Sequence, residues 1–328
     1  MQTNSKITQS HAIAAMSQVP FGPTTCLYTI EQACQQALKI SSIYTTQIDE
    51  DGQERIYLNK SGHKLTSLMP ILKDCPFLNG RIAHTKAHPF LESFYHISQQ
   101  SGLYYIQPNQ EPDQDFCLNT IQQIKHHQLT RQYDQRLQDW NNQLSEPTVQ
   151  VDGFLKGISK TVSGYDLHEV VCSYPLNQDM YSSAPFTSQS DFAESMDTEI
   201  TRLICQSKEN AVCGVLVKSE VSIHYQLVRR FLIFTECQYI DDPSSFTNLE
   251  FMNEVRRLIE PNSLNRVVLA CNHLNGFLSS NRFLKKSSDF KEQIKRLKAY
   301  VVGTDKLIRV GGVQPTFKVL FSKFEIKQ

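Results

Sequence analysis

The chain has 328 residues, and its 33 Lys plus Arg balance its 33 Asp plus Glu, so the formal net charge is zero. Hydrophobic residues make up 40% of the chain and charged residues 20%, which excludes wholesale disorder. The balanced charge also excludes a polycation that binds phosphates along its whole length, so such binding needs a local concentration of Lys and Arg. Because a domain usually has roughly 100–200 residues, the length favours two domains.

The nine cysteines are scattered, and no two are separated by only two residues, so the paired-thiolate signature of a zinc site is missing. Several lie in apolar runs such as 211–215 (AVCGV), as expected of small core residues in a reducing compartment. Residues 1–9 are polar and lack a signal-peptide pattern, and no stretch approaches the ~18 apolar residues that cross a bilayer. We therefore expect a cytoplasmic protein with no membrane partner.

The sequence of the first half of the chain predicts a mainly helical region. Residues 27–38 and 63–72 mix polar and apolar side chains in the manner of short helices, and Asp51-Gly52 predicts a hairpin turn between two short strands. From residue 116 to residue 144, apolar side chains recur at steps of three and four, which predicts one long helix.

A domain boundary is expected where this long helix ends. Pro147 should end the helix, because proline lacks a backbone donor and restricts the residue before it. We therefore place the boundary near residues 147–153. It separates an N-terminal, mainly helical region of unknown role (1–150) from a second domain (151–328).

The second domain has the order strand, helix, strand, strand, helix, strand, helix. Short strand-like apolar runs and helical spacing place these elements at 167–175, 191–206, 212–217, 223–234, from 242 onward, 264–271 and 287–302. This order predicts an α+β fold with an antiparallel-rich sheet and helices packed on one face, a ferredoxin-like arrangement of the split βαβ kind.

Residues 281–328 carry a basic excess that the whole-chain sum hides. They contain twelve Lys or Arg and four Asp or Glu, so 12 − 4 gives a local charge of +8. A polyanion such as DNA would release counterions on binding there. The expected nucleic-acid contacts are Lys295, Arg296, Lys298 and Arg309. The alternative is a solvated helix face with a solubilising tail.

Three residues near position 220 form a mixed oxygen and nitrogen set. His224 and Gln226 project to the same side of a strand, because strand side chains alternate between faces. Glu220 ends the preceding strand and can turn toward them. A carboxylate, an imidazole and an amide oxygen suit Mg²⁺ or Mn²⁺. The alternative is that His224 is an ordinary core or surface residue.

Tyr300 lies on the last helix. The buried stripe of this helix follows spacings of four, three and four: Phe290, Ile294, Leu297 and Val301. Tyr300 falls about 80–90° from the centre of the stripe, so we expect a half-buried ring whose hydroxyl reaches an open cleft. Arg296 and Lys306 lie near enough to assist an anionic phosphate there. The alternative is an interface tyrosine with its hydroxyl in water.

Three segments in this order resemble motifs of one superfamily. Residues 212–220 (VCGVLVKSE) are similar to a strand of the form vGyiwklE, residues 224–228 (HYQLV) to HyHlv, and residues 298–306 (KAYVVGTDK) to a helix that carries YLaK. The chain thus resembles the HUH superfamily of rolling-circle replication initiators over roughly residues 165–310. The likeness is to the prophage group called YagK/YfjJ-type, which is similar to initiators of filamentous phages (inoviruses).

The resemblance implies an HUH-like domain, of the kind also described as RRM-like, that cleaves single-stranded DNA at a replication origin. Glu220, His224 and Gln226 would hold one Mg²⁺ or Mn²⁺ ion that polarises the scissile phosphate. Tyr300 would attack it and give a 5′-phosphotyrosine and a free 3′-hydroxyl, while Lys306 would neutralise developing charge. Partners implied by this role are the origin DNA and a host helicase and polymerase.

Three departures from the family pattern leave other functions open. Gln226 replaces the second histidine, Gly303 stands where the family has a lysine, and the link between Glu220 and His224 is short. Gln226 and Gly303 favour a second hypothesis, a DNA- or RNA-binding module of a prophage or mobile element that keeps the sheet and has lost catalysis. A third is a protein-interaction domain.

Overall fold

The chain divides into two compact units, which are described separately. Residues 26–81 and 87–142 form the helical unit, and residues 143–328 with 82–86 form the sheet unit. The computed structural model describes residues 26–48, 50–80, 85–108, 110–175, 183–206, 212–221, 226–237, 250–259, 266–269, 281–310 and 317–323. Within these ranges, every helix is too short or too polar to span a bilayer.

The helical unit contains the two short helices and the hairpin that the sequence predicts. Its elements are α2 (Cys26–Ala37), β1 (Tyr44–Ile48), β2 (Glu54–Leu58), α3 (Lys60–Asp74), α4 (Pro89–Ser101), η1 (Leu103–Tyr105), α5 (Gln114–Gln128) and the first part of α6 (Arg131–Thr161). β1 and β2 pair antiparallel, and Gly52 has a φ of 75° in their turn, where glycine meets no steric penalty. Asn59 begins α3 by accepting hydrogen bonds from the amides of Ser61 and Gly62.

The predicted single helix over residues 116–144 is wrong, because the chain forms two helices there. α5 ends at Gln128, and the next residue, Leu129, is 80% exposed, so it lies outside the buried stripe. Thr130 then accepts a hydrogen bond through Oγ1 from the amide of Tyr133 and so begins α6. A residue that caps a new helix therefore interrupts the three- and four-residue spacing.

The predicted helix end at Pro147 is also wrong, because α6 continues to Thr161. A proline inside a helix lowers the stability of that helix by about 3 kcal/mol. Against this cost, α6 buries four large apolar side chains after the proline, and the burial of each stabilises the fold by about 1.5–3 kcal/mol. They are Val151, Phe154, Leu155 and Ile158. Packing therefore outweighs the local preference, and the division between the two units falls inside this helix, at residues 142–143.

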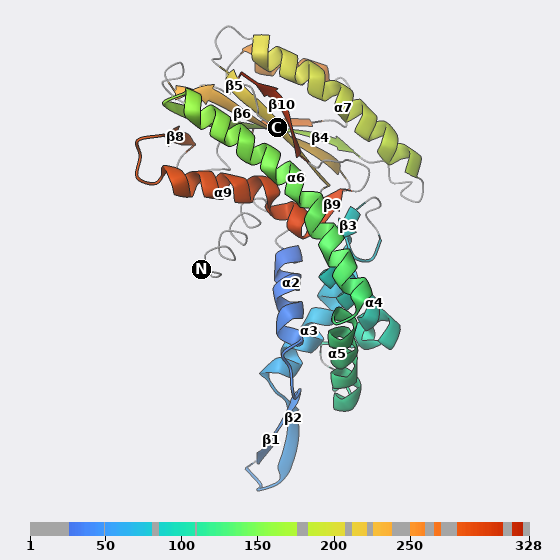
Figure 1. Ribbon diagram of the computed structural model, residues 1–328. Helices are drawn as coiled ribbons and strands as arrows, with labels where there is room; N and C mark the ends of the chain where they lie inside the picture. Colours follow the sequence, from blue (N-terminus) through green and yellow to red (C-terminus); the bar gives the residue numbers. More distant parts are fainter. Residues whose placement is uncertain are drawn as a thin grey trace. The chain divides into compact units, whose positions relative to one another are not determined.

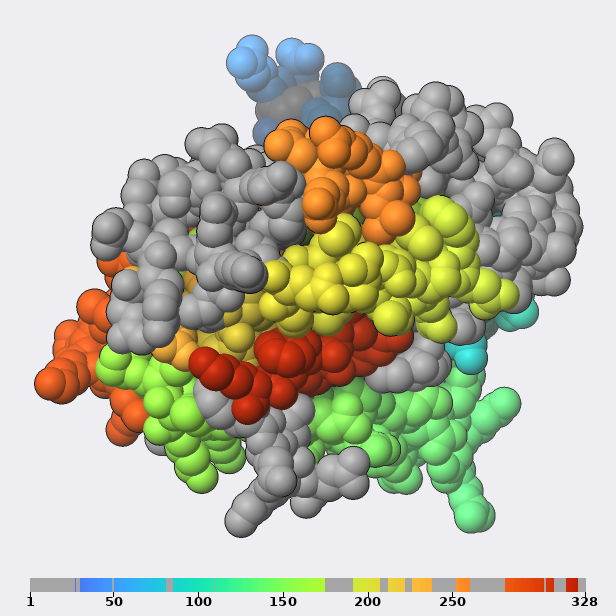
Figure 2. Space-filling model, turned by 90° about the horizontal axis from the view of Figure 1, so that it is seen from above, coloured from blue at the N-terminus to red at the C-terminus, as the bar shows by residue number. Residues whose placement is uncertain are grey.

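The sheet unit is α+β, as predicted, and its sheet is antiparallel. Its elements are β4 (Gly164–Pro175), α7 (Ser183–Gln206), β5 (Val212–Val221), β6 (Gln226–Glu236), α8 (Glu250–Ile259), β7 (Arg266–Leu269), β8 (Arg282–Leu284), α9 (Phe290–Gly303), η5 (Thr304–Lys306), β9 (Ile308–Val310) and β10 (Phe317–Ser322). The strand order is β10-β5-β6-β4-β7, and β8 also pairs with β4. Figure 2 shows the edge strand β10 as a dark red stripe at the surface. A short β3 (Thr85–Ala87) pairs with β9.

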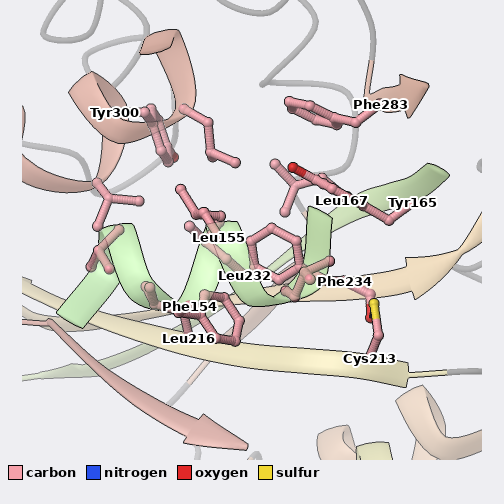
Figure 3. Close-up of a cluster of buried hydrophobic side chains, with 14 of the residues drawn as sticks. Phe154, Leu155, Tyr165, Leu167, Cys213, Leu216, Leu232, Phe234, Phe283 and Tyr300 are labelled. Carbon is pink, nitrogen blue, oxygen red and sulfur yellow. Dashed lines mark hydrogen bonds between the residues drawn. The ribbon is translucent and has the colours of Figure 1, made fainter. Parts of the chain in front are cut away.

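Helices cover both faces of the sheet, so the prediction of helices on one face is wrong. α7 and α8 pack on one face, and α9 packs with the later part of α6 on the other (Figure 1, Figure 3). Gly214 of β5 permits the close approach of α6, because a Cβ there would lie 2.5 Å from the Phe154 ring. The second helical layer was missed because α6 was expected to stop at Pro147.

His168 gives the fold a measurable pH dependence. Its ring is buried, with Nε2 3.0 Å from Thr235 Oγ1, and burial lowers its pKa from 6.5 to about 4 although Asp166 acts in the opposite sense. As the pH falls through this window, the unfolded chain takes up a proton that the folded chain does not, so stability is lost. Between about pH 7 and pH 4, we expect wild type to lose roughly 3 kcal/mol more unfolding free energy than His168→Gln. Urea unfolding at each pH measures this, and parallel curves would contradict it.

Candidate functional site

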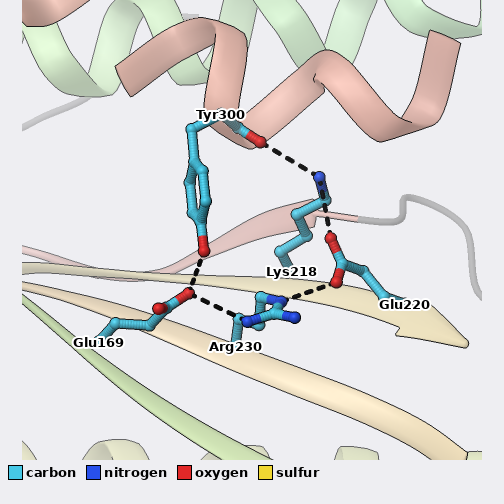
Figure 4. Close-up of polar contacts among 5 residues, drawn as sticks. All are labelled: Glu169, Lys218, Glu220, Arg230 and Tyr300. Atoms are coloured by element: carbon cyan, nitrogen blue, oxygen red, sulfur yellow. Dashed lines mark hydrogen bonds and ion pairs between the residues drawn. The ribbon is translucent and has the colours of Figure 1, made fainter. Parts of the chain in front are cut away.

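Five polar side chains meet beneath α9 in the sheet unit (Figure 4). Glu169 comes from β4, Lys218 and Glu220 from β5, Arg230 from β6 and Tyr300 from α9. Strand alternation explains why they share a face: Lys218 and Glu220 are two residues apart, and Lys218 is paired with Arg230. None is more than 4% exposed. We call these five residues the charge cluster.

The charge cluster joins α9 to three strands through continuous polar contacts. Arg230 donates from Nε to Glu220 Oε2 at 2.7 Å, and its Nη1 lies 3.5 Å from Glu169 Oε1. Lys218 Nζ lies 3.2 Å from Glu220 Oε1 and donates to the backbone oxygen of Tyr300 at 3.3 Å. The Tyr300 hydroxyl donates to Glu169 Oε1. Tyr300 therefore binds the sheet through both its side chain and its main chain.

Burial and charge give the members of the cluster different protonation behaviour. Burial raises the pKa of Glu169, and Arg230 with the Tyr300 hydroxyl opposes this only in part. Burial also opposes ionisation of Glu220, but Arg230 and Lys218 together hold its pKa below the usual value. Burial, followed by the Glu169 carboxylate, raises the pKa of Tyr300 well above 10. Tyr300 is therefore a protonated donor at neutral pH.

The expectation that Tyr300 is half-buried with its hydroxyl in an open cleft is wrong, since the residue is 1% exposed. Its position at the edge of the apolar stripe is real, but that edge faces a polar part of the sheet. Glu169 lies beneath the ring and accepts a hydrogen bond from the Tyr300 hydroxyl. A stripe counted on one helix cannot reveal such a partner, which lies 131 residues away in the sequence.

The expected metal ligands are only partly suited to an ion in this arrangement. Both oxygens of Glu220 already face cations, so Glu220 could bind a metal only after Lys218 or Arg230 moves away. Gln226 begins β6 on the face that Arg230 occupies, and its buried Oε1 has no hydrogen-bond partner, which suits a ligand oxygen. His224 lies outside the described residues. In the described ranges, no three His, Cys, Asp or Glu side chains are grouped as a metal site.

The other predicted contact residues have different surroundings. Lys295 and Lys306 are exposed. Arg296 lies 3.4 Å from Glu292, and Lys298 pairs with Asp152 of α6. Arg309 is 3% exposed and donates to Asp305 O at 2.9 Å and to Gln143 Oε1 at 3.0 Å, and burial lowers its pKa to about 10. The Arg309 guanidinium therefore forms hydrogen bonds within the protein and does not face a DNA phosphate in this arrangement.

Exposed lysines lie on α6, on the segment after β8 and on α9, and those on α6 were not selected from the sequence. We call these six residues the lysine surface: Lys156, Lys160, Lys285, Lys286, Lys291 and Lys295. Lys285 Nζ donates to the Lys160 carbonyl at 3.4 Å, so the two segments are in contact. Among the described residues, no carboxylate lies within 4.0 Å of any of the six ammonium groups. Lys156 and Lys160 are four residues apart, a spacing that indicates one helix face.

A second buried arginine lies on the opposite face of the sheet. Arg229 donates from Nη2 to Asp197 Oδ2 at 2.8 Å, and Lys318 Nζ lies 3.6 Å from the same oxygen. Burial raises the pKa of Asp197 to about 6, although Arg229 and Lys318 lower it. Two adjacent arginines in an apolar strand must point to opposite faces, and each needs a buried acid. Two adjacent arginines in an apolar strand were therefore the sequence signal for both the charge cluster and the group around Arg229.

Comparison with known proteins identifies no relative. No family model, no curated protein and no solved structure matches the chain. The likeness to replication initiators thus rests on the three short segments named above, and function has to be argued from the charge cluster and the lysine surface.

Proposed function

We propose that the chain is a nucleic-acid-binding protein of the rolling-circle initiator type that binds single-stranded DNA through the lysine surface without cutting it. Supporting this, β4, α7, β5, β6, α8 and β7 follow in the order expected of a ferredoxin-like unit. β6 lies between β5 and β4, and β7 lies beyond β4, which is the strand order of that arrangement. The choice of single-stranded DNA comes from the resemblance.

The lysine surface is the observation that carries the proposal. Its six ammonium groups are exposed, and none has a carboxylate within salt-bridge distance among the described residues. Each of these ammonium groups can neutralise a DNA phosphate, and the cations condensed on that phosphate are then released into solution, which favours binding. By contrast, Arg296 and Lys298, which the sequence singled out, each face an acid of their own.

The charge cluster argues for binding without cleavage. A nucleophile must reach the phosphate and lose its proton, but Tyr300 is 1% exposed and its pKa lies well above 10. Glu220 is held by two cations, and Gly303 stands where the family has lysine. The cluster therefore attaches α9, which carries part of the lysine surface, firmly to the sheet.

Charge reversal on α6 tests the proposal. In the full chain, Lys156→Glu with Lys160→Glu should weaken binding of labelled oligo-dT at least about tenfold at low salt, and lower the slope of log affinity against log salt by about 1.4. The matched control is Arg202→Glu with Arg257→Glu on α7 and α8, which makes the same change in charge on the other face of the sheet and should change affinity less than about twofold. Fluorescence anisotropy measures both quantities. Equal effects of the two changes would overturn the lysine surface as the binding site.

Cleavage is a second candidate function, and one observation favours it. Glu220 and Gln226 lie on the sheet face that α9 covers, and the Tyr300 hydroxyl of α9 already donates a hydrogen bond to Glu169 on that face. If α9 moved outward far enough to admit a strand, the Tyr300 oxygen could form a bond to the scissile phosphorus as the P–O3′ bond breaks. The phenol proton would pass to Glu169 and from there to the departing 3′-oxygen, which leaves as a hydroxyl. A Mg²⁺ or Mn²⁺ ion held by Gln226, and by Glu220 once Lys218 is displaced, would polarise the phosphate.

A further inference from the structure

A large groove lies between α2 and α3 in the helical unit, far in sequence from the lysine surface. Its volume is about 1050 Å³. Its floor is apolar, and each helix contributes one stripe at steps of three or four residues: Ile30, Ala33, Ala37 and Ile40 from the α2 segment, and Leu65, Leu68 and Ile71 from α3. Ile71 is 50% exposed. Ala33 and Ile40 are partly exposed, whereas Ile30, Ala37, Leu65 and Leu68 are buried. Within the described residues, the apolar surface that the groove leaves open is therefore that of Ala33, Ile40 and Ile71.

The rim of this groove is basic. Lys39, Lys60, His63 and Lys64 line it, and all four are exposed. The remaining lining residues are apolar or neutral, so no acid contributes to this part of the described surface. Lys64 Nζ donates to Gln36 Oε1 at 3.1 Å across the two helices. The groove therefore combines an apolar floor with uncompensated positive charge at its edges.

We propose that this groove binds an acidic amphipathic helix of a partner protein. A partner helix with apolar residues at i, i+3, i+4 and i+7 would place them on the floor, where burial is favourable. Its acidic side chains would then face Lys39, Lys60 and Lys64, which favours fast association and selects against basic partners. A nucleic acid fits less well, because its phosphates and sugars would cover an apolar floor without burying apolar groups.

A designed peptide tests the fit directly. The probe is a labelled peptide of about 18 residues, or five helical turns, with Leu wherever the spacing i, i+3, i+4 and i+7 continues along it and Glu at most other positions. The full chain should bind this peptide, and it should bind a Lys-for-Glu version and a scrambled version at least about tenfold more weakly. Hydrogen exchange should show protection confined to α2 and α3. Equal binding of all three peptides would overturn the proposal.

Two groove variants and two matched controls locate the site. Ile71→Asp, and Lys60→Glu with Lys64→Glu, should each weaken peptide binding at least about tenfold. Leu129→Asp and Arg131→Glu change exposed residues of the same unit outside the groove and should alter affinity less than about twofold. Unchanged binding by the groove variants would overturn the proposal. So would competition by oligo-dT that depends on Lys60 and Lys64, since it would make the groove a nucleic-acid site.

Discussion

Arg230→Met is expected to lower the free energy of unfolding by about 3–5 kcal/mol, one of the largest effects of any single change in the sheet unit. Arg230 is fully buried and lies between Glu169 and Glu220. Methionine has a similar length but no charge, so Glu220 would keep Lys218 as its cation while Glu169 would lose the guanidinium that faces it. Removing one partner of a buried ion pair leaves an uncompensated charge, and Glu169 would have to take up a proton.

Two further variants give this prediction its controls. Arg296→Met removes an arginine whose pair with Glu292 is largely exposed, and it should cost less than about 1 kcal/mol. Adding Glu169→Gln to Arg230→Met should recover a measurable part of the loss, because the buried carboxylate that lost its partner is removed. Urea unfolding measures all three proteins. A loss below about 1 kcal/mol for Arg230→Met would show that the charge cluster does not hold the fold together.

Phe154→Ala is expected to cost about 3–5 kcal/mol, because it leaves a cavity between α6 and the sheet. Phe154 is fully buried, and its ring lies edge-on to Phe234 with centroids 5.2 Å apart. It also packs against Gly214, where no side chain intervenes. The substitution therefore tests whether the later part of α6 forms the second helical layer.

Phe192→Ala on α7 is the matched control for Phe154→Ala. Phe192 is 39% exposed, so truncation removes less buried surface and should cost about 1 kcal/mol or less. Thermal or urea unfolding of the two variants gives the comparison. If Phe154→Ala were no more harmful than Phe192→Ala, the packing of α6 on the sheet would be contradicted.

Elements with local signals could be predicted from the sequence. The hairpin at Asp51-Gly52 and the strand-like apolar runs of the central strands follow from the chemistry of a few adjacent residues, and they form as expected. The path of α6 could not be predicted in the same way. A proline is a local signal against a helix, whereas the opposing burial of Phe154 and Ile158 depends on strands that follow much later in the chain.

In the candidate site, too, some residues could be selected from local sequence signals and others depend on contacts between distant segments. Glu220 and Tyr300 were selected from sequence, and the fold brings them into one cluster, although the roles expected of them stay predictions. Glu169 was not selected, because a lone acid in an apolar strand has no partner until β4 pairs with β6. Arg229 and Arg230 could have been selected, since two arginines inside an apolar strand need buried acids on both faces.

Binding without cleavage is tested most directly by incubating the full chain with labelled single-stranded DNA and Mn²⁺. One sample is then analysed natively and one after denaturation. If the protein binds DNA without cutting it, wild type and Tyr300→Phe should both form a native complex that dissociates completely on denaturation. A complex that survives denaturation in wild type but is absent in Tyr300→Phe would contradict binding without cleavage and would make Tyr300 the nucleophile.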